Sequence, residues 1–131
     1  MKDNLTEVRE ALRTFQADSA LFAIAVYAID GDYAIRIAAE GAKCGNCERV
    51  HLSTGNIGAV ARSGQVHLTA DVHSDPAYKS CFADVRAETV VPVLLGGRVV
   101  GVIDAESSDR APIDPSVLAT LAARIAPFVH P

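Results

Sequence analysis

Residues 81–106, CFADVRAETVVPVLLGGRVVGVIDAE, contain two apolar runs, 89–95 and 99–103, separated by Gly96 and Gly97. β-branched residues on either side of a glycine pair are typical of two antiparallel strands joined by a tight turn. Because both runs are apolar at nearly every position, we expect these strands to be buried on both faces. The stretch therefore predicts a hairpin at the centre of the sheet.

Three acidic residues, Glu88, Asp104 and Glu106, adjoin the ends of these runs. Acidic side chains are seldom buried without a partner, so their position indicates a wet cavity at one rim of the sheet. Asp104 and Glu106 share a face because strand side chains alternate. A three-residue loop that pairs Leu94 with Arg98 would bring Glu88 opposite Asp104, whereas a two-residue turn would put Glu88 on the other face. We predict the three-residue loop, with a glycine at positive φ.

The remaining sequence predicts an α+β domain that spans residues 1–131. Apolar residues recur at spacings of three and four over residues 4–17, and again after Asp114 and Pro115, which start a helix. We expect these terminal helices to cover one face of an antiparallel sheet. The other predicted elements are a hairpin over 20–29 and 33–39, a short helix over 56–62 capped by Ser53 or Thr54 and ended by Gly64, a strand over 66–69 and a polar loop over 71–80.

The composition limits the classes of partner. The chain has 131 residues, a formal net charge of −4 and 21% charged residues, without the clustered basic surface that nucleic-acid binding needs. No apolar stretch approaches the roughly 20 residues of a membrane helix and no export signal is seen, so we expect a cytoplasmic protein. In such a protein, Cys44, Cys47 and Cys81 are expected to be reduced thiols or to include a redox pair.

Cys44 and Cys47 are separated by two residues, a spacing that zinc sites also use. His51 or His73 could contribute further ligands to such a site. A single CxxC pair without a second pair is a weak signal, and we therefore expect neither a metal nor a cofactor.

Three segments together resemble a GAF domain, a small-molecule-binding module. They are GNIGAVARSGQ at 55–65, ADVHSDP at 70–76 and VVPVLLGGRVVGVIDAES at 90–107, followed by the helix that Asp114 starts. The resemblance covers residues from about Ala20 to Val129. It implies a central antiparallel sheet, with the N- and C-terminal helices on one face and a ligand pocket under loops on the other.

A narrower resemblance is to the free methionine-R-sulfoxide reductases, which are stand-alone GAF proteins with catalytic activity. In that family a cysteine follows the histidine of a DVH loop by eight residues, a glutamate follows that cysteine by seven, and an acid-x-acid pair lies on the next strand. This chain has His73, Cys81, Glu88, Asp104 and Glu106 at those spacings.

Two further positions match the family and three depart from it. Cys47 corresponds to a second cysteine of the family, and Tyr27 to an aromatic residue of its pocket. The chain has Ile57 where the family commonly has a third cysteine, and Ala23 where it has a tryptophan. Glu106 stands where the family usually has aspartate.

The resemblance implies a catalytic cycle at cysteine. Cys81 would attack the sulfoxide sulfur and become a sulfenic acid, which Cys47, or alternatively Cys44, would resolve to a disulfide. The Cα atoms of Cys47 and Cys81 would then have to come within about 7 Å of each other. Thioredoxin would reduce the disulfide again.

The implied substrate is free L-methionine-R-sulfoxide or a similar small zwitterion, bound by Glu88, Asp104, Glu106 and Tyr27. Two acids held close together cannot both ionise easily, so we expect one to keep its proton and donate it to the sulfoxide oxygen. The remaining carboxylates would hold the substrate's ammonium group. His73 is expected to be a hydrogen-bonding loop residue rather than a general base, and a homodimer is compatible with an exposed face on the terminal helices.

A second hypothesis is a non-catalytic GAF protein that binds a small ligand for sensing or signalling. The residues that favour it are Ala23 and Ile57, where the chain lacks the family's tryptophan and third cysteine.

Overall fold

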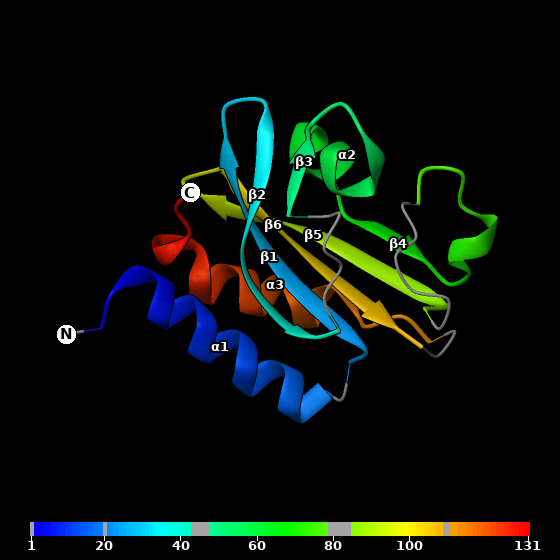
Figure 1. Ribbon diagram of the computed structural model, residues 1–131, viewed down its shortest axis with the longest axis horizontal. Coiled ribbons are helices and arrows are strands. Elements are labelled where there is room, and N and C mark those ends of the chain that lie inside the picture. The colour runs from blue at the N-terminus through cyan, green and yellow to red at the C-terminus, as the bar shows by residue number, and fades with distance from the viewer. Residues whose placement is uncertain (1, 20, 43–47, 79–84, 109–110) are drawn as a thin grey trace.

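The computed structural model describes residues 2–19, 21–42, 48–78, 85–108 and 111–131 (Figure 1). Cys44, Cys47 and Cys81 lie outside the described residues, as does the predicted approach of Cys47 to Cys81. None of the helices in the described part of the chain is long and apolar enough to span a bilayer.

The described residues form a six-stranded antiparallel sheet in the order β3-β2-β1-β6-β5-β4. The strands are β1 (Ala23–Asp30), β2 (Tyr33–Gly41), β3 (Arg49–His51), β4 (His67–Thr69), β5 (Ala87–Leu95) and β6 (Arg98–Ser107). The helices are α1 (Asn4–Ser19), α2 (Gly55–Ser63), α3 (Pro115–Ile125) and the short 3₁₀ turns η2 (Val72–Ser74) and η3 (Ala126–Phe128).

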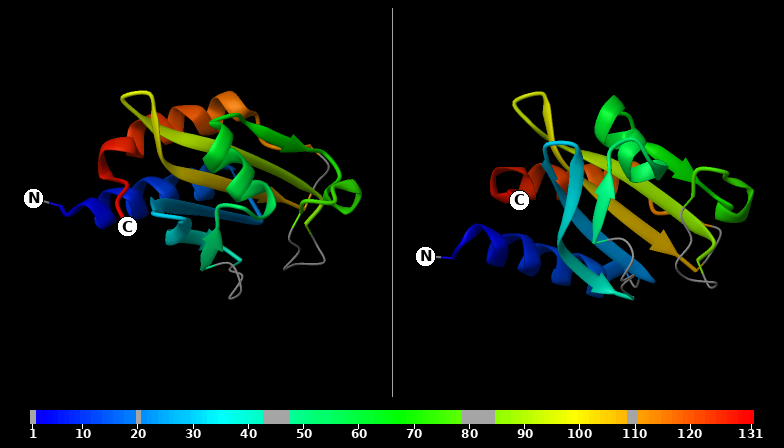
Figure 2. Two further views of the ribbon diagram at one scale, coloured as in Figure 1. Left: turned by 90° about the horizontal axis from the view of Figure 1, so that it is seen from above. Right: turned by 45° about the horizontal axis from the view of Figure 1, so that its top comes forward.

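The sheet separates two apolar clusters. α1 and α3 lie side by side on one face, and α2 lies on the opposite face (Figures 1 and 2). The larger cluster, between the terminal helices and the sheet, includes Leu12, Ile24, Ile103, Leu118 and Ile125. The smaller cluster, beside α2, includes Tyr27, Val60, Val90 and Val102. This arrangement confirms the predicted α+β architecture with the terminal helices on one face.

The β5–β6 hairpin closes with a two-residue turn, so the predicted three-residue loop is wrong. Leu95 pairs with Arg98, and Gly96 and Gly97 have φ of 60° and 78°. This backbone is that of the primed turns that match the twist of paired strands. Both glycines supply the positive φ that other residues adopt only at a cost.

A β-bulge nevertheless brings the three acids to one face. Val93 pairs with Gly101 and Leu94 with Val99, so Val100 is an extra residue in β6. The extra residue shifts the register by one and sets Glu88 opposite Glu106. Asp104 lies two residues from Glu106 on β6 and therefore points to the same face. The prediction that the three acids share a face is correct, but it was based on a three-residue loop, whereas the structure has a two-residue turn and a bulge.

The acids also lie within the strands rather than beyond their ends, where the sequence placed them. β6 continues to Ser107 because it has a partner on each side in this region. On the β1 side, Ala23 pairs with Glu106 and Ala25 with Asp104. The carboxyl groups are therefore held by the paired backbone of the sheet.

Gly58 allows α2 to dock closely on the backbone that precedes it. A Cβ at Gly58 would lie 2.5 Å from the carbonyl oxygen of Leu52, which is backbone and cannot rotate away. We expect Gly58→Ala to lower the free energy of unfolding by about 1–3 kcal/mol, measured by urea unfolding.

Gly31→Asn is the matched control for this substitution. Gly31 has a φ of 59°, which asparagine tolerates, and an added Cβ would meet nothing within 4 Å. This variant should unfold within about 0.5 kcal/mol of the wild type. Equal stability of Gly58→Ala and Gly31→Asn would contradict the close docking of α2.

Candidate active site

Three carboxyl groups converge on the face of the sheet that carries α2. Glu88 comes from β5, and Asp104 and Glu106 come from β6; one oxygen from each lies within 4.8 Å of the others. Glu88 is 4% exposed and Asp104 is 7% exposed, while Glu106 is half-buried. We call these three residues the acid cluster.

The acid cluster cannot easily carry three negative charges. Burial raises the pKa of Asp104 well above its usual range, and the nearby charges of Glu88 and Glu106 raise it further. Burial and the charge of Glu88 also raise the pKa of Glu106, against the opposing effect of hydrogen bonds with Asp104 and Tyr78. No group among the described residues makes a hydrogen bond to Asp104 Oδ1. Asp104 is therefore the member best suited to keep its proton.

Tyr78 adds a neutral donor at the edge of the cluster. Its hydroxyl donates a hydrogen bond to Glu106 Oε2 at 3.1 Å. Burial, together with the charge and hydrogen bond of Glu106, raises the pKa of Tyr78. The phenol therefore stays protonated and can act only as a donor to this carboxylate.

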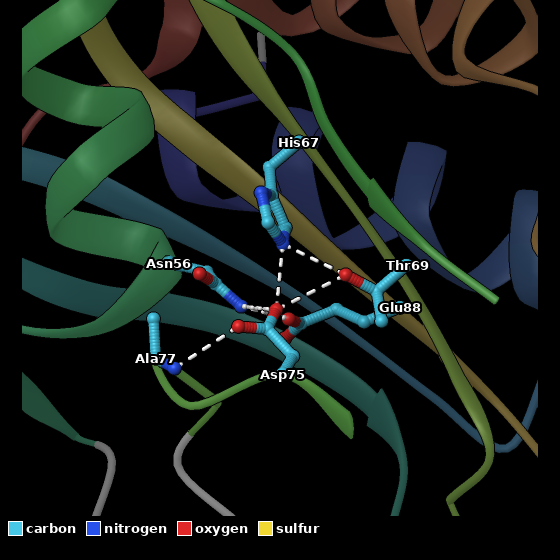
Figure 3. A network of polar contacts seen from close by, with 6 residues as sticks. All are labelled: Asn56, His67, Thr69, Asp75, Ala77 and Glu88. Carbon is cyan, nitrogen blue, oxygen red and sulfur yellow. Dashed lines mark hydrogen bonds and ion pairs between the residues drawn. The ribbon is translucent and has the colours of Figure 1, made fainter. Parts of the chain in front are cut away.

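A second polar network adjoins the cluster through Asn56 (Figure 3). Asn56 Nδ2 donates to Glu88 Oε1 and to Asp75 Oδ2, both at 3.0 Å. Asp75 Oδ2 also receives hydrogen bonds from Thr69 Oγ1 at 3.0 Å and His67 Nε2 at 2.9 Å, and the backbone N–H of Ala77 donates to Asp75 Oδ1 at 3.0 Å. Burial opposes ionisation of Asp75, but these hydrogen bonds together lower its pKa to about 2.

The other residues expected at the site lie in different surroundings. Tyr27 is 2% exposed and packs in the smaller apolar cluster, on the same face as the acids. His73 is exposed on η2, where its backbone N–H donates to Asp71. Ala23 faces the cluster as the cross-strand neighbour of Glu106, and Ile57 is half-buried on α2. The three cysteines lie outside the described residues.

The acid cluster is suited to a small cation. A primary ammonium group has three N–H donors, which two carboxylates and the carbonyl oxygen of a protonated carboxyl group can accept. Mg²⁺ usually keeps several water ligands and Ca²⁺ takes six to eight oxygens, so both ions favour more open or larger ligand sets than this one. Glu88 and Asp104 are 4% and 7% exposed, so their oxygens have little contact with solvent.

Asn56, Asp75 and Tyr78 were not among the residues expected at the site. Asn56 is a polar residue at an inward-facing position of a short helix, which is a recognisable signal. Tyr78 lies three residues before Cys81 in the sequence. Asp75 has no comparable signal, because its partners come from α2 and β4 and are known only from the fold.

The raised pKa of Asp104 links its proton to stability. The folded protein binds this proton more tightly than the unfolded chain does. The stability linked to it is fully present below about pH 4 and is lost as the pH rises through the raised pKa. Glu106 acts in the same direction. Asp75 acts in the opposite direction, because its lowered pKa contributes stability that is lost as the pH falls toward about 2.

We therefore expect Asp104→Asn to stabilise the protein at pH 8 by about 1–3 kcal/mol, because the amide avoids the cost of ionising a buried carboxyl group and adds N–H donors. The gain should shrink toward pH 4.5, where the wild-type carboxyl holds its proton. Urea unfolding across this pH range measures both effects.

Asp32→Asn, in the exposed turn between β1 and β2, is the control for the loss of one negative charge. It should unfold within about 0.5 kcal/mol of the wild type at pH 8, as expected for an exposed position. A stability difference between Asp104→Asn and wild type that does not vary with pH would contradict the titration of Asp104 between pH 4.5 and pH 8.

Comparison with known proteins gives several matches to this fold. The chain is similar to a type II free methionine-R-sulfoxide reductase from Thermoplasma acidophilum, with a TM-score of 0.91 and 24% identity over 97% of this chain and 92% of that chain. It is also similar to the free methionine-R-sulfoxide reductase from Neisseria meningitidis, solved in complex with its substrate, with a TM-score of 0.87 and 24% identity over 97% of this chain and 78% of that chain.

A shorter match is to Protein YtsP of Bacillus subtilis (strain 168), with 33% identity over 61 residues. These residues cover 47% of this chain and 37% of that relative, so the matched part is well under half of the relative's length. The pattern of the GAF domain family matches residues 5–127, nearly the whole chain. The protein therefore belongs to the GAF domain family.

Proposed function

We propose that the protein reduces free L-methionine-R-sulfoxide to methionine. The observation that carries the proposal is the acid cluster, in which three carboxyl groups lie within 4.8 Å of one another on one face of the sheet. The similarity in fold to free methionine-R-sulfoxide reductases supports it. The spacing of Cys81 and Glu88 in the sequence supports it independently.

The cluster favours a free amino acid over a residue within a peptide. Glu88 and Glu106 each have a hydrogen-bond donor from the protein, Asn56 and Tyr78 respectively, and so are suited to remain acceptors. A substrate ammonium group would supply the positive charge that these acceptors lack. A methionine sulfoxide residue in a peptide has no such ammonium group.

Asp104 is suited to be the acid. In the proposed step, the Cys81 thiolate attacks the sulfoxide sulfur, and Asp104 provides the proton to the sulfoxide oxygen. The oxygen passes to Cys81 as a sulfenic acid, and the substrate sulfur is reduced to the thioether of methionine. Asp104 then recovers a proton from solvent.

The resolving thiol completes the cycle. The thiol of Cys47, or alternatively of Cys44, attacks the sulfenic acid of Cys81, which releases water and forms a disulfide. Thioredoxin reduces the disulfide by two electrons and restores both thiols. We place this cycle in the cytoplasm, where such a reductant keeps thiols reduced.

A second candidate function is ligand binding without turnover. Ala23 is the cross-strand neighbour of Glu106, where the resemblance implies a tryptophan, and its small side chain removes an aromatic wall next to the acids. Ile57 stands where the family has a third cysteine. A sensory GAF protein could keep the acid cluster for binding and use no thiol chemistry.

Turnover separates these two functions. We expect the reduced protein to convert free L-methionine-R-sulfoxide through many cycles with thioredoxin, thioredoxin reductase and NADPH, followed as NADPH oxidation. Cys81→Ser should abolish the reaction, because it removes the attacking thiolate. Cys47→Ser should keep a single turnover without thioredoxin and lose the multiple-turnover rate, unless Cys44 resolves. Tight binding of the sulfoxide with no turnover would support the ligand-binding function and exclude the reductase.

The ammonium group gives a second test. We expect N-acetyl-methionine-R-sulfoxide, which lacks the ammonium, to have a kcat/KM at least about a hundredfold lower than the free amino acid, as expected when a charged contact is lost. The matched control is the methyl ester, which keeps the ammonium and should react much better than the acetylated compound. Equal use of the acetylated compound and the free amino acid would contradict the role of the cluster.

A further inference from the structure

We propose that Asn56 is a positioning residue for substrate binding, because it bridges Asp75 and Glu88 and fixes the Glu88 carboxylate in the acid cluster. This inference rests on the proposed function. It assigns a role to a residue outside the set that the sequence resemblance implies.

Asn56 donates both of its amide hydrogens to carboxylate groups. Its Nδ2 atom lies 3.0 Å from Asp75 Oδ2 and 3.0 Å from Glu88 Oε1, and a primary amide has two N–H donors. The residue is 5% exposed, so water can replace these contacts only poorly. The opposite amide orientation would point an oxygen at two carboxylates, which fixes the nitrogen on this side.

Asp75 anchors the far end of the bridge. It receives hydrogen bonds from His67 and Thr69 of β4 and from the backbone N–H of Ala77 (Figure 3). These contacts tie its carboxylate to two separate segments of the chain. Asn56 therefore has an immobile acceptor on one side, and its second N–H is aimed at Glu88.

The bridge also screens two acids from each other. Because each oxygen lies 3.0 Å from the same nitrogen, the accepting oxygens of Asp75 and Glu88 are at most about 6 Å apart, close enough for strong repulsion in a buried site. Removal of the amide would leave this repulsion uncompensated, and Glu88 would turn away from Asp75. The set of acceptors for the substrate ammonium would then be lost.

The test compares Asn56→Ala with Val60→Ala on the same helix. Val60 is 1% exposed and packs in the apolar cluster beside α2, so its truncation controls for loss of stability. We expect Asn56→Ala to raise the KM for free L-methionine-R-sulfoxide by about ten- to a hundredfold, the effect of removing a hydrogen bond to a charged group, while kcat changes by less than about threefold. Val60→Ala should lower the melting temperature and leave KM unchanged.

Asn56→Asp is a second variant of nearly the same shape. It places a third carboxyl group between two others, and it should raise KM at least as much as the alanine variant. An unchanged KM in both Asn56 variants, or an equal increase in Val60→Ala, overturns the inference.

A measurement without substrate separates this inference from the proposed function. Carboxyl ¹³C resonances of Asp and Glu side chains report the titration of the acid cluster directly. We expect Asn56→Ala to move the midpoints of this titration upward by about half a pH unit or more, because a donor to a carboxylate is lost. If the wild type shows no turnover but the midpoints move, the proposed reaction fails and the positioning role stands. Unchanged midpoints overturn the positioning role whether or not the protein is an enzyme.

Discussion

Crowding of three carboxyl groups on a buried sheet face is the constraint on which the rest of the site depends. Glu88, Asp104 and Glu106 lie where water is scarce, so each needs a donor, a proton or a cation. Asn56 supplies a donor to Glu88, and Tyr78 supplies one to Glu106. Asp104 therefore needs a proton of its own or a positively charged group that enters the site. The same arrangement costs stability at neutral pH and favours a cationic ligand, as is common where binding sites are built into a fold.

The fold could be predicted from the sequence because its signals are local. Helical periodicity at both ends and the apolar runs around Gly96 and Gly97 depend on neighbouring residues alone. The turn type was predicted incorrectly, because a bulge several residues away compensates for a shorter turn. Pairing between β1 and β6 decided how far the acids lie inside the sheet, and this pairing joins segments far apart in the sequence. Pairing between distant segments cannot be recognised from a short stretch of sequence.

The residues of the candidate site likewise include some that the sequence indicates and others that only the fold reveals. The acids at 88, 104 and 106 could be singled out because charges next to apolar strands are unusual. Asn56 and Asp75 contribute through partners that only the folded chain brings together. Tyr27 was expected as part of the pocket; it lies on the same face as the acids, packed in the apolar cluster beside α2. Candidate ligand contacts could thus be proposed from composition and spacing, whereas the residues that hydrogen-bond to them required coordinates.

The extra residue Val100 in β6 has an evolutionary consequence. Side chains alternate with a period of two, so the shared face of Glu88 and Glu106 depends on whether the number of residues between them is odd or even. Loss of a single residue with the bulge retained would set the two acids on opposite faces, or force β6 out of step with β1, whereas loss of Val100 itself would remove the bulge and keep Glu88 opposite Glu106. Insertion or deletion of two residues at the turn between β5 and β6 would preserve the acid cluster. The hairpin can therefore vary in length among descendants of this chain only in even steps, unless a bulge is gained or lost at the same time.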